Sequence, residues 1–161
     1  MKKFPKFLAG LVVLALFGSM SLQAQDKAGA LAIVVNKASA LDDVASPLLQ
    51  KYFKAEKTKA PDGTKLVIVM MDLGRPERDA ALHTIYKMSE SEYNDYFVGQ
   101  TFTGAVAAAP KSFASPGLIK QFVAGNVGAI SYLRASDADD TVKVLKVDGK
   151  LPGDAGYPLT F

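Results

Sequence analysis

The chain has 161 residues, no cysteine and one histidine, with 19 basic and 16 acidic side chains. The lack of cysteine excludes disulfides, thiolate nucleophiles and zinc–thiolate sites. One histidine without cysteine is a poor ligand set for a metal, so we expect no cofactor.

Residues 1–24 are predicted to be a signal peptide. Three lysines lie in the first six residues, ahead of the apolar stretch Leu8–Phe17, which is too short to span a membrane as a stable helix. Small and polar residues follow as far as Ala24, where we expect cleavage. The interpretation predicts a periplasmic protein; an uncleaved anchor helix is the alternative.

Residues 25–161 have the length of one domain with a real core. Without the three leader lysines the basic and acidic groups balance at 16 each, so the basic pI belongs to the export signal. Nucleic-acid binding needs a net basic face and is not expected. No later stretch is long and apolar enough to span a membrane.

The first half of the domain shows two strands and the start of a helix. Ala30–Val35 carries no charge and indicates a strand covered on both faces. Ser46 and Pro47 are typical of a helix start, with serine as the cap. Leu66–Met71 is a second apolar run and predicts a buried strand. A helical pattern then follows over Ala80–Met88.

The second half begins with a capping-box spacing from Ser89 to Glu92, which predicts a helix that Gly99–Gly104 should end. Ser115 followed by proline starts a third amphipathic helix. Two strands are expected after it, a short one at Ala129–Leu133 and a half-exposed one at Thr141–Val147.

Strands near residues 31, 66, 130 and 144, with helices between them, predict a single α/β domain. Open α/β folds bind ligands where a strand's carboxyl end turns into a helix. The turn after Met71 is such a place.

Asp72, Arg75 and Arg78 in this turn form the candidate site for a small anion. Arginine offers forked donors that match phosphate or carboxylate oxygens, and a helix start adds free N–H groups. Glu77 and Asp79 stand in the same helical turn, however, and repel an anion. The competing interpretation is a solvated helix start whose charges neutralise one another.

Two other constellations suggest different functions. Arg75, Arg78 and His83 could serve a hydrolase or transferase, but no nucleophile elbow is present, and we expect a protein that is not an enzyme. Tyr93, Tyr96 and Phe97 could instead bind an envelope protein or a second copy if they form one exposed patch; residues at helical spacing are more often core.

Seven segments resemble the phosphate ABC transporter substrate-binding protein family and occur in the family's order. They are Ile33–Asn36, Leu48–Phe53, Asp62–Val69, Gly74–Leu82, Glu92–Gly104, Val127–Leu133 and Val142–Gly149. The resemblance implies a single periplasmic-binding-protein-like (type II) lobe, with a mixed, mostly parallel sheet flanked by helices. It also implies a non-enzymatic solute-binding or accessory role in transport.

The chain departs from that family at the ligand. Where the family places a Ser-Gly-Thr run beside its phosphate-binding arginine, this chain has Arg75-Pro76-Glu77-Arg78-Asp79, without hydroxyls. Ser131 stands where the family has a glycine before a tyrosine. Full-length members close two lobes over the ligand, whereas this chain has the length of one. The resemblance therefore implies the fold more strongly than it implies phosphate binding.

Overall fold

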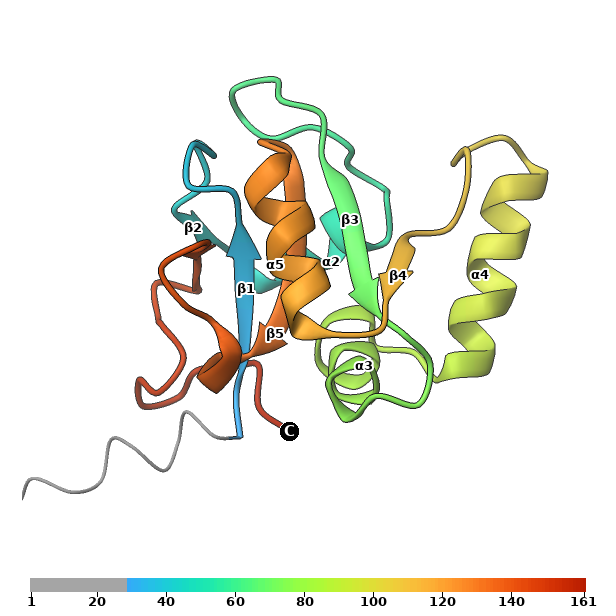
Figure 1. Ribbon diagram of the computed structural model, residues 1–161. Helices are drawn as coiled ribbons and strands as arrows, with labels where there is room; N and C mark the ends of the chain where they lie inside the picture. Colours follow the sequence, from blue (N-terminus) through green and yellow to red (C-terminus); the bar gives the residue numbers. More distant parts are fainter. Residues whose placement is uncertain (1–28) are drawn as a thin grey trace, which may run out of the picture.

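The computed structural model describes residues 29–161, so the predicted signal peptide lies outside the described residues. Its centre is a five-stranded sheet with the strand order β4-β3-β5-β1-β6 (Figure 1). The strands are β1 (Leu31–Val35), β3 (Val67–Met71), β4 (Lys111–Phe113), β5 (Ala129–Arg134) and β6 (Lys143–Val144).

The sheet is mixed and mostly parallel, as predicted. Strand β3 runs parallel to β4 and to β5, whereas β1 runs antiparallel to both β5 and β6. Four strands therefore point one way, and only β1 opposes them. The long β1–β5 pairing, from Leu31 opposite Arg134 to Val35 opposite Ile130, fixes the register at the centre.

Helices cover both faces of this sheet (Figure 1). Helix α5 (Pro116–Gly125) lies on one face and α2 (Ser46–Phe53) on the other. Helix α3 (Pro76–Ala81) follows β3 and continues into a π-helical segment, η1 (Leu82–Tyr86). Helix α4 (Glu90–Phe102) stands beside the β4 edge. The remaining elements are β2 (Asp43–Val44), η2 (Ala135–Asp137) and β7 (Lys146–Val147); β2 and β7 form a small separate sheet.

The core is continuous across the central strands. Every residue of β1 is buried, which confirms that both faces of this uncharged strand are covered. A cluster of rings lies beneath α2, with the Phe53 ring 5.7 Å from Tyr86 and 6.1 Å from Tyr132 between centres. The Tyr132 hydroxyl accepts a hydrogen bond from the Met71 backbone N–H at 3.2 Å, so this buried polar group is satisfied.

Gly128 is required where the chain enters β5. A Cβ atom at this position would lie 2.1 Å from the backbone carbonyl oxygen of Lys65. Backbone cannot retreat as a side chain can, so only glycine permits the approach that starts the β3–β5 pairing.

The start of α2 differs from the prediction. Ser46 is the first helical residue and Ala45 is the cap position, where no side-chain cap bond forms. The cap comes from Asp148, whose carboxylate accepts hydrogen bonds from the Ser46 backbone N–H, at 2.8 Å, and from its hydroxyl. An acceptor about a hundred residues away in sequence leaves no local signal for this role.

Helix α4 ends at Phe102, inside the segment Gly99–Gly104 that was predicted to end it, and passes through Gly99 because a glycine inside a helix is tolerated at modest cost. Two other predictions were wrong. Strand β4 was missed because it has only three residues and its sequence is polar. The segment Thr141–Val147 divides at the buried Leu145 into β6 and β7, which belong to different sheets.

Candidate functional site

The candidate site lies at the carboxyl ends of the parallel strands β3, β4 and β5, where α3 begins (Figure 1). Gly74 has a φ of 81°, a left-handed conformation that lets the chain turn sharply into the helix. Pro76 is the first helical residue, as predicted, and Arg75 occupies the cap position. This is the kind of edge at which open α/β folds bind ligands.

Arg78 points into the protein and not toward solvent. Only 7% of it is exposed, and its Nε and Nη2 donate to the two carboxylate oxygens of Glu90, each at 2.8 Å. Its Nη1 donates to the Met71 backbone oxygen at 3.0 Å. The guanidinium also lies over the ring of Tyr93, 5.0 Å from the ring centre.

Each of the three nitrogens of the Arg78 guanidinium therefore has a partner within the chain. The hydrogen bonds that Arg78 donates to Glu90 raise the pKa of Arg78 above its ordinary value, so the group stays charged. Burial raises the pKa of the neighbouring Tyr93 hydroxyl to about 12. Sequence alone identified Arg78 but not this partner at the start of the next helix.

Glu77 is the second charged group that the fold turns inward, with only 4% exposed. Its Oε1 accepts from Nε and Nη2 of Arg134, at 3.2 and 3.1 Å. Its Oε2 lies 3.7 Å from Nε of Arg75, and both atoms are buried without a hydrogen-bond partner among the described residues. The arginine cation therefore compensates this oxygen through charge alone.

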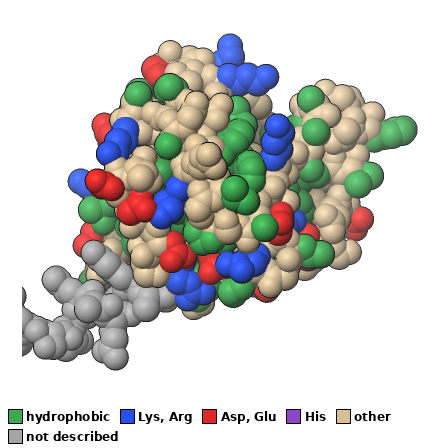
Figure 2. All heavy atoms as spheres, viewed as in Figure 1, with side chains coloured by type: hydrophobic (Ala, Val, Ile, Leu, Met, Phe, Trp, Pro, Cys, Tyr) green, Lys and Arg blue, Asp and Glu red, His purple; other side chains and the backbone are tan. Residues whose placement is uncertain are grey.

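The predicted residues are thus brought to one place but are not arranged alike. Arg75 is the more accessible of the two predicted arginines, with 42% of its side chain exposed against 8% for Arg78. Asp72 is half-buried, and its backbone N–H donates to the Phe113 carbonyl oxygen, which ties the turn to β4. Acidic and basic side chains alternate along this lower edge in Figure 2.

Arg134 and Phe161 belong to the same cluster and were missed from the sequence. The Arg134 guanidinium lies 4.5 Å from the centre of the Phe161 ring, at the end of the chain. Arg134 is the last residue of β5. Its place at the carboxyl end of a predicted strand was the signal that could have identified it.

The enzyme alternative gains no geometric support. His83 is exposed on η1, and within residues 29–161 no hydrogen bond or ion pair joins it to Asp79, Arg75 or Arg78. The part of the chain that the structure describes also holds no group of three metal-ligating side chains.

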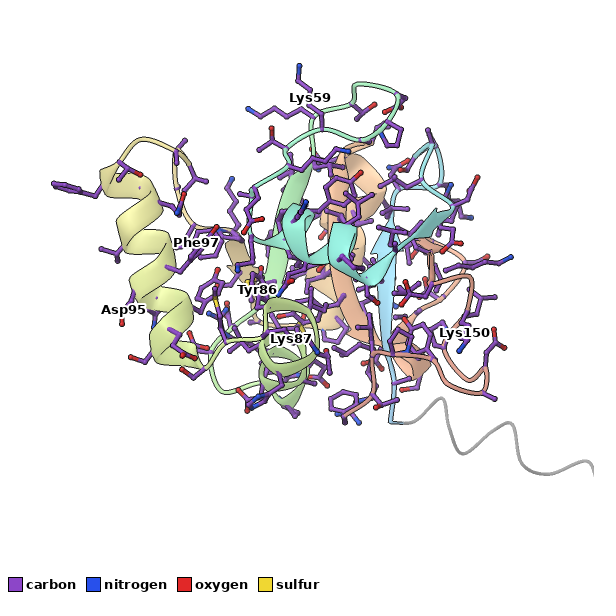
Figure 3. The ribbon with its side chains drawn as sticks, turned by 180° about the vertical axis from the view of Figure 1, so that it is seen from behind. Lys59, Tyr86, Lys87, Asp95, Phe97 and Lys150 are labelled. Atoms are coloured by element: carbon purple, nitrogen blue, oxygen red, sulfur yellow. The ribbon has the colours of Figure 1, made fainter. Side chains whose placement is uncertain are left out.

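Tyr93, Tyr96 and Phe97 do not form one exposed patch, so this alternative is removed and the core interpretation is supported. Tyr93 and Phe97 are buried, at 4% and 2% exposed, and pack against Tyr86 with ring centres 5.2 and 6.5 Å away. Tyr96 is half-buried and donates its hydroxyl proton to the Lys54 carbonyl oxygen. Figure 3 shows Phe97 pointing from α4 toward Tyr86 and Asp95 pointing away. These rings attach the helix to the body because burying them removes apolar surface from water.

Comparison with known proteins identifies a shared fold. No protein-family profile matches the chain, and no curated protein does. Solved structures with a similar fold include a phosphate transport receptor and a phosphate-binding protein, together with others titled putative or possible phosphate-binding proteins.

Among them is a phosphate transport receptor from Vibrio cholerae, with a TM-score of 0.63 and 18% identity over 77% of this chain and 48% of that one. Another is titled a putative phosphate ABC transporter substrate-binding protein with bound phosphate, from Clostridium perfringens, with a TM-score of 0.61 and 23% identity over 79% of this chain and 49% of that one. PstS from Borrelia burgdorferi has a TM-score of 0.59 and 11% identity over 84% of this chain and 56% of that one.

The resemblance expected from the sequence is therefore confirmed at the level of the fold. The chain spans about half the length of these structures, as a single lobe would. Within residues 29–161, no helix has both the length and the apolar character needed to cross a membrane.

Proposed function

We propose that this protein is an exported, non-enzymatic accessory protein built on one solute-binding lobe, which binds small anions weakly at the Asp72–Asp79 turn. The signal peptide predicted from the sequence and the shared fold support this role. We expect weak affinity because the arginines of the turn are already paired with acidic side chains of the same chain, above all Arg78 with Glu90.

The energetics of capture follow from these contacts. Tight binding of a dianion needs several convergent donors in a site closed to water. Arg78 has already given its donors to Glu90 and Met71. Arg75 remains partly accessible, but the carboxylate of Glu77 lies 3.7 Å from it. We therefore expect a phosphate dissociation constant of about 1 mM or weaker, equivalent to roughly 4 kcal/mol of binding.

Calorimetry of the exported protein with inorganic phosphate tests this function. We expect weak binding that disappears in Arg75→Ala and persists in the matched variant Lys59→Ala. Lys59 lies at the opposite end of the molecule from α3 (Figure 3). Thermal shifts with phosphate, sulfate and carboxylates provide an independent readout, because a ligand that binds only the folded state raises Tm.

Two outcomes would count against the proposal. Micromolar phosphate affinity that Arg75→Ala removes would show a true high-affinity site, whose acids do not oppose the ligand. Binding unchanged by Arg75→Ala, or absent at tens of millimolar phosphate, would remove the anion site from this turn.

A further inference from the structure

The carboxylate of Glu77 lies between two arginines that come from different elements. Arg75 precedes it at the cap position of α3, and Arg134 is the last residue of β5. The end of β5, the end of the chain and α3 lie at the same end of the molecule (Figure 1). Arginines that converge on one carboxylate are a common arrangement for binding a small oxyanion. Here the oxyanion belongs to the protein itself.

Arg134 holds this carboxylate as it would hold a free one. Its Nε and Nη2 both donate to Oε1 of Glu77, at 3.2 and 3.1 Å. The Phe161 ring lies 4.5 Å from the Arg134 guanidinium and helps to keep it in place. The Glu77 side chain is 5% exposed, whereas those of Arg75 and Arg134 are 42% and 34% exposed. The acid is therefore buried, while both cations reach the solvent from which an external anion can approach them.

The second oxygen of Glu77 fits its surroundings poorly. Oε2 lies 3.7 Å from Nε of Arg75, which is beyond hydrogen-bond length. Both atoms are buried and lack a hydrogen-bond partner among residues 29–161, although buried polar atoms are usually paired. The attachment of the glutamate to α3 limits how far its carboxylate can move toward Arg75. A free carboxylate has no such attachment, so it can rotate to contact both arginines.

We propose that Glu77 is the resident ligand of a carboxylate site formed by Arg75 and Arg134, and that an external anion must displace it. The inference rests on the proposed function, because it names the class of anion that the same turn accepts and what limits access to it. A group attached to the chain competes at a high effective concentration. External anions therefore bind the natural protein weakly, and removal of Glu77 opens the site to a free monocarboxylate.

Replacement of the lost group by acetate tests this inference. Glu77→Ala removes a CH₂–COO⁻ group, which has the same heavy atoms as acetate. We expect acetate to bind this variant with a dissociation constant of about 10 mM, at least about tenfold tighter than it binds the natural protein. With acetate at about 100 mM, the Tm of Glu77→Ala should rise by about 5 °C and that of the natural protein by less than about 2 °C. Acetamide, which is neutral, and sodium chloride at equal ionic strength should not reproduce the rise.

Two matched variants separate this site from a general effect of charge. Glu92→Ala removes the same group from the start of α4, where the carboxylate accepts from the backbone N–H and the hydroxyl of Ser89. Its Tm should not respond to acetate beyond the response of the natural protein. Glu77→Ala combined with Arg134→Gln should lose the acetate response, because the two donors that hold the carboxylate are gone.

Glu77→Gln provides a second test if Glu77→Ala does not fold with or without acetate. It keeps the shape of the side chain but leaves Arg75 and Arg134 without their anion. Because the amide stays attached in the site, the gain should be smaller, with acetate binding about threefold tighter than in the natural protein. Calorimetry measures this affinity.

Several results would overturn the inference. One is a Tm of Glu77→Ala that acetate does not raise, or that acetamide raises equally; another is an acetate response that persists without Arg134. Equal acetate affinities of Glu77→Gln and the natural protein would also overturn it. These results would make Glu77 part of a structural ion pair only. A natural protein that binds no phosphate would defeat the proposed function, but the acetate response of Glu77→Ala would still decide this inference separately.

Discussion

The turn before α3 and the outer side of α4 differ in which side chains they bury and which they expose to water. At the turn, charged groups lie inward: Arg78 and Glu77 are 7% and 4% exposed, and each is matched by opposite charge. On α4, apolar groups lie outward, with Phe102 at 92% exposed. The paired charges leave the turn few free donors for an anion, which fits weak binding there, whereas the apolar groups on α4 remain in water.

The largest expected effect contrasts two phenylalanines of the same helix. Phe97→Ala should lower the free energy of unfolding by about 3 kcal/mol, because it removes a buried ring that packs on Tyr86 and Tyr93. Phe102→Ala should change it by less than about 0.5 kcal/mol, since that ring touches little of its own chain. Urea denaturation measures both. Equal losses would show that the two sides of α4 are not different.

The next effect concerns the two arginines of the turn. Arg78→Ala should cost about 2 kcal/mol, because Glu90 and the Met71 oxygen lose their donors. This is less than for a fully buried pair because the Glu90 side chain is 29% exposed. Arg75→Ala, in the same turn but 42% exposed, should cost less than about 1 kcal/mol. Chemical denaturation measures the loss of stability in both variants. A larger loss for Arg75→Ala would show that Arg75, and not Arg78, is the structural arginine of the turn.

Alkaline pH tests the contact between the two regions at Tyr93, which lies beneath Arg78 and lines a surface groove along α4. Burial raises its pKa to about 12, so between about pH 10 and 12 the unfolded chain loses this proton while the folded chain keeps it. Stability from this group is complete below pH 10 and falls as pH rises, by about 2 kcal/mol at pH 11.5.

Tyr93→Phe should remove this part of the decline. Burial also raises the pKa of Tyr86, Tyr132 and Tyr157, so a remaining decline is expected in the variant. Urea midpoints at pH 8, 10 and 11.5 for the two proteins give the difference. Parallel pH profiles would contradict burial of the Tyr93 hydroxyl.

The smallest effect concerns the acid that closes the turn. Glu77→Gln removes the charge that faces Arg75 and Arg134, so phosphate affinity should rise about threefold, the size expected of a partly exposed charge interaction. Asp95→Asn, which removes an exposed acid on α4, should leave it unchanged. Calorimetry with phosphate measures both, and no gain in Glu77→Gln would mean that Glu77 does not limit the site.

Much of the fold could be predicted because its signals are local. Uncharged runs gave β1 and β3, and Ser115 with Pro116 gave the start of α5, where the serine side chain accepts from the Leu118 N–H. The Ser89–Glu92 capping box is also present as expected. Each of these depends on residues a few positions apart, so the sequence carries the whole interaction.

The sequence by itself determined the α/β class, the central strands β1, β3 and β5, and the placing of Asp72, Arg75 and Arg78 at a strand's carboxyl end. Only the tertiary structure decided which way the side chains there point. The Asp148 cap of Ser46, the burial of Arg78 against Glu90 and the match of Arg134 to Glu77 join separate elements. Burial of a charge depends on a partner that folding brings near, and a linear pattern contains no distances between elements.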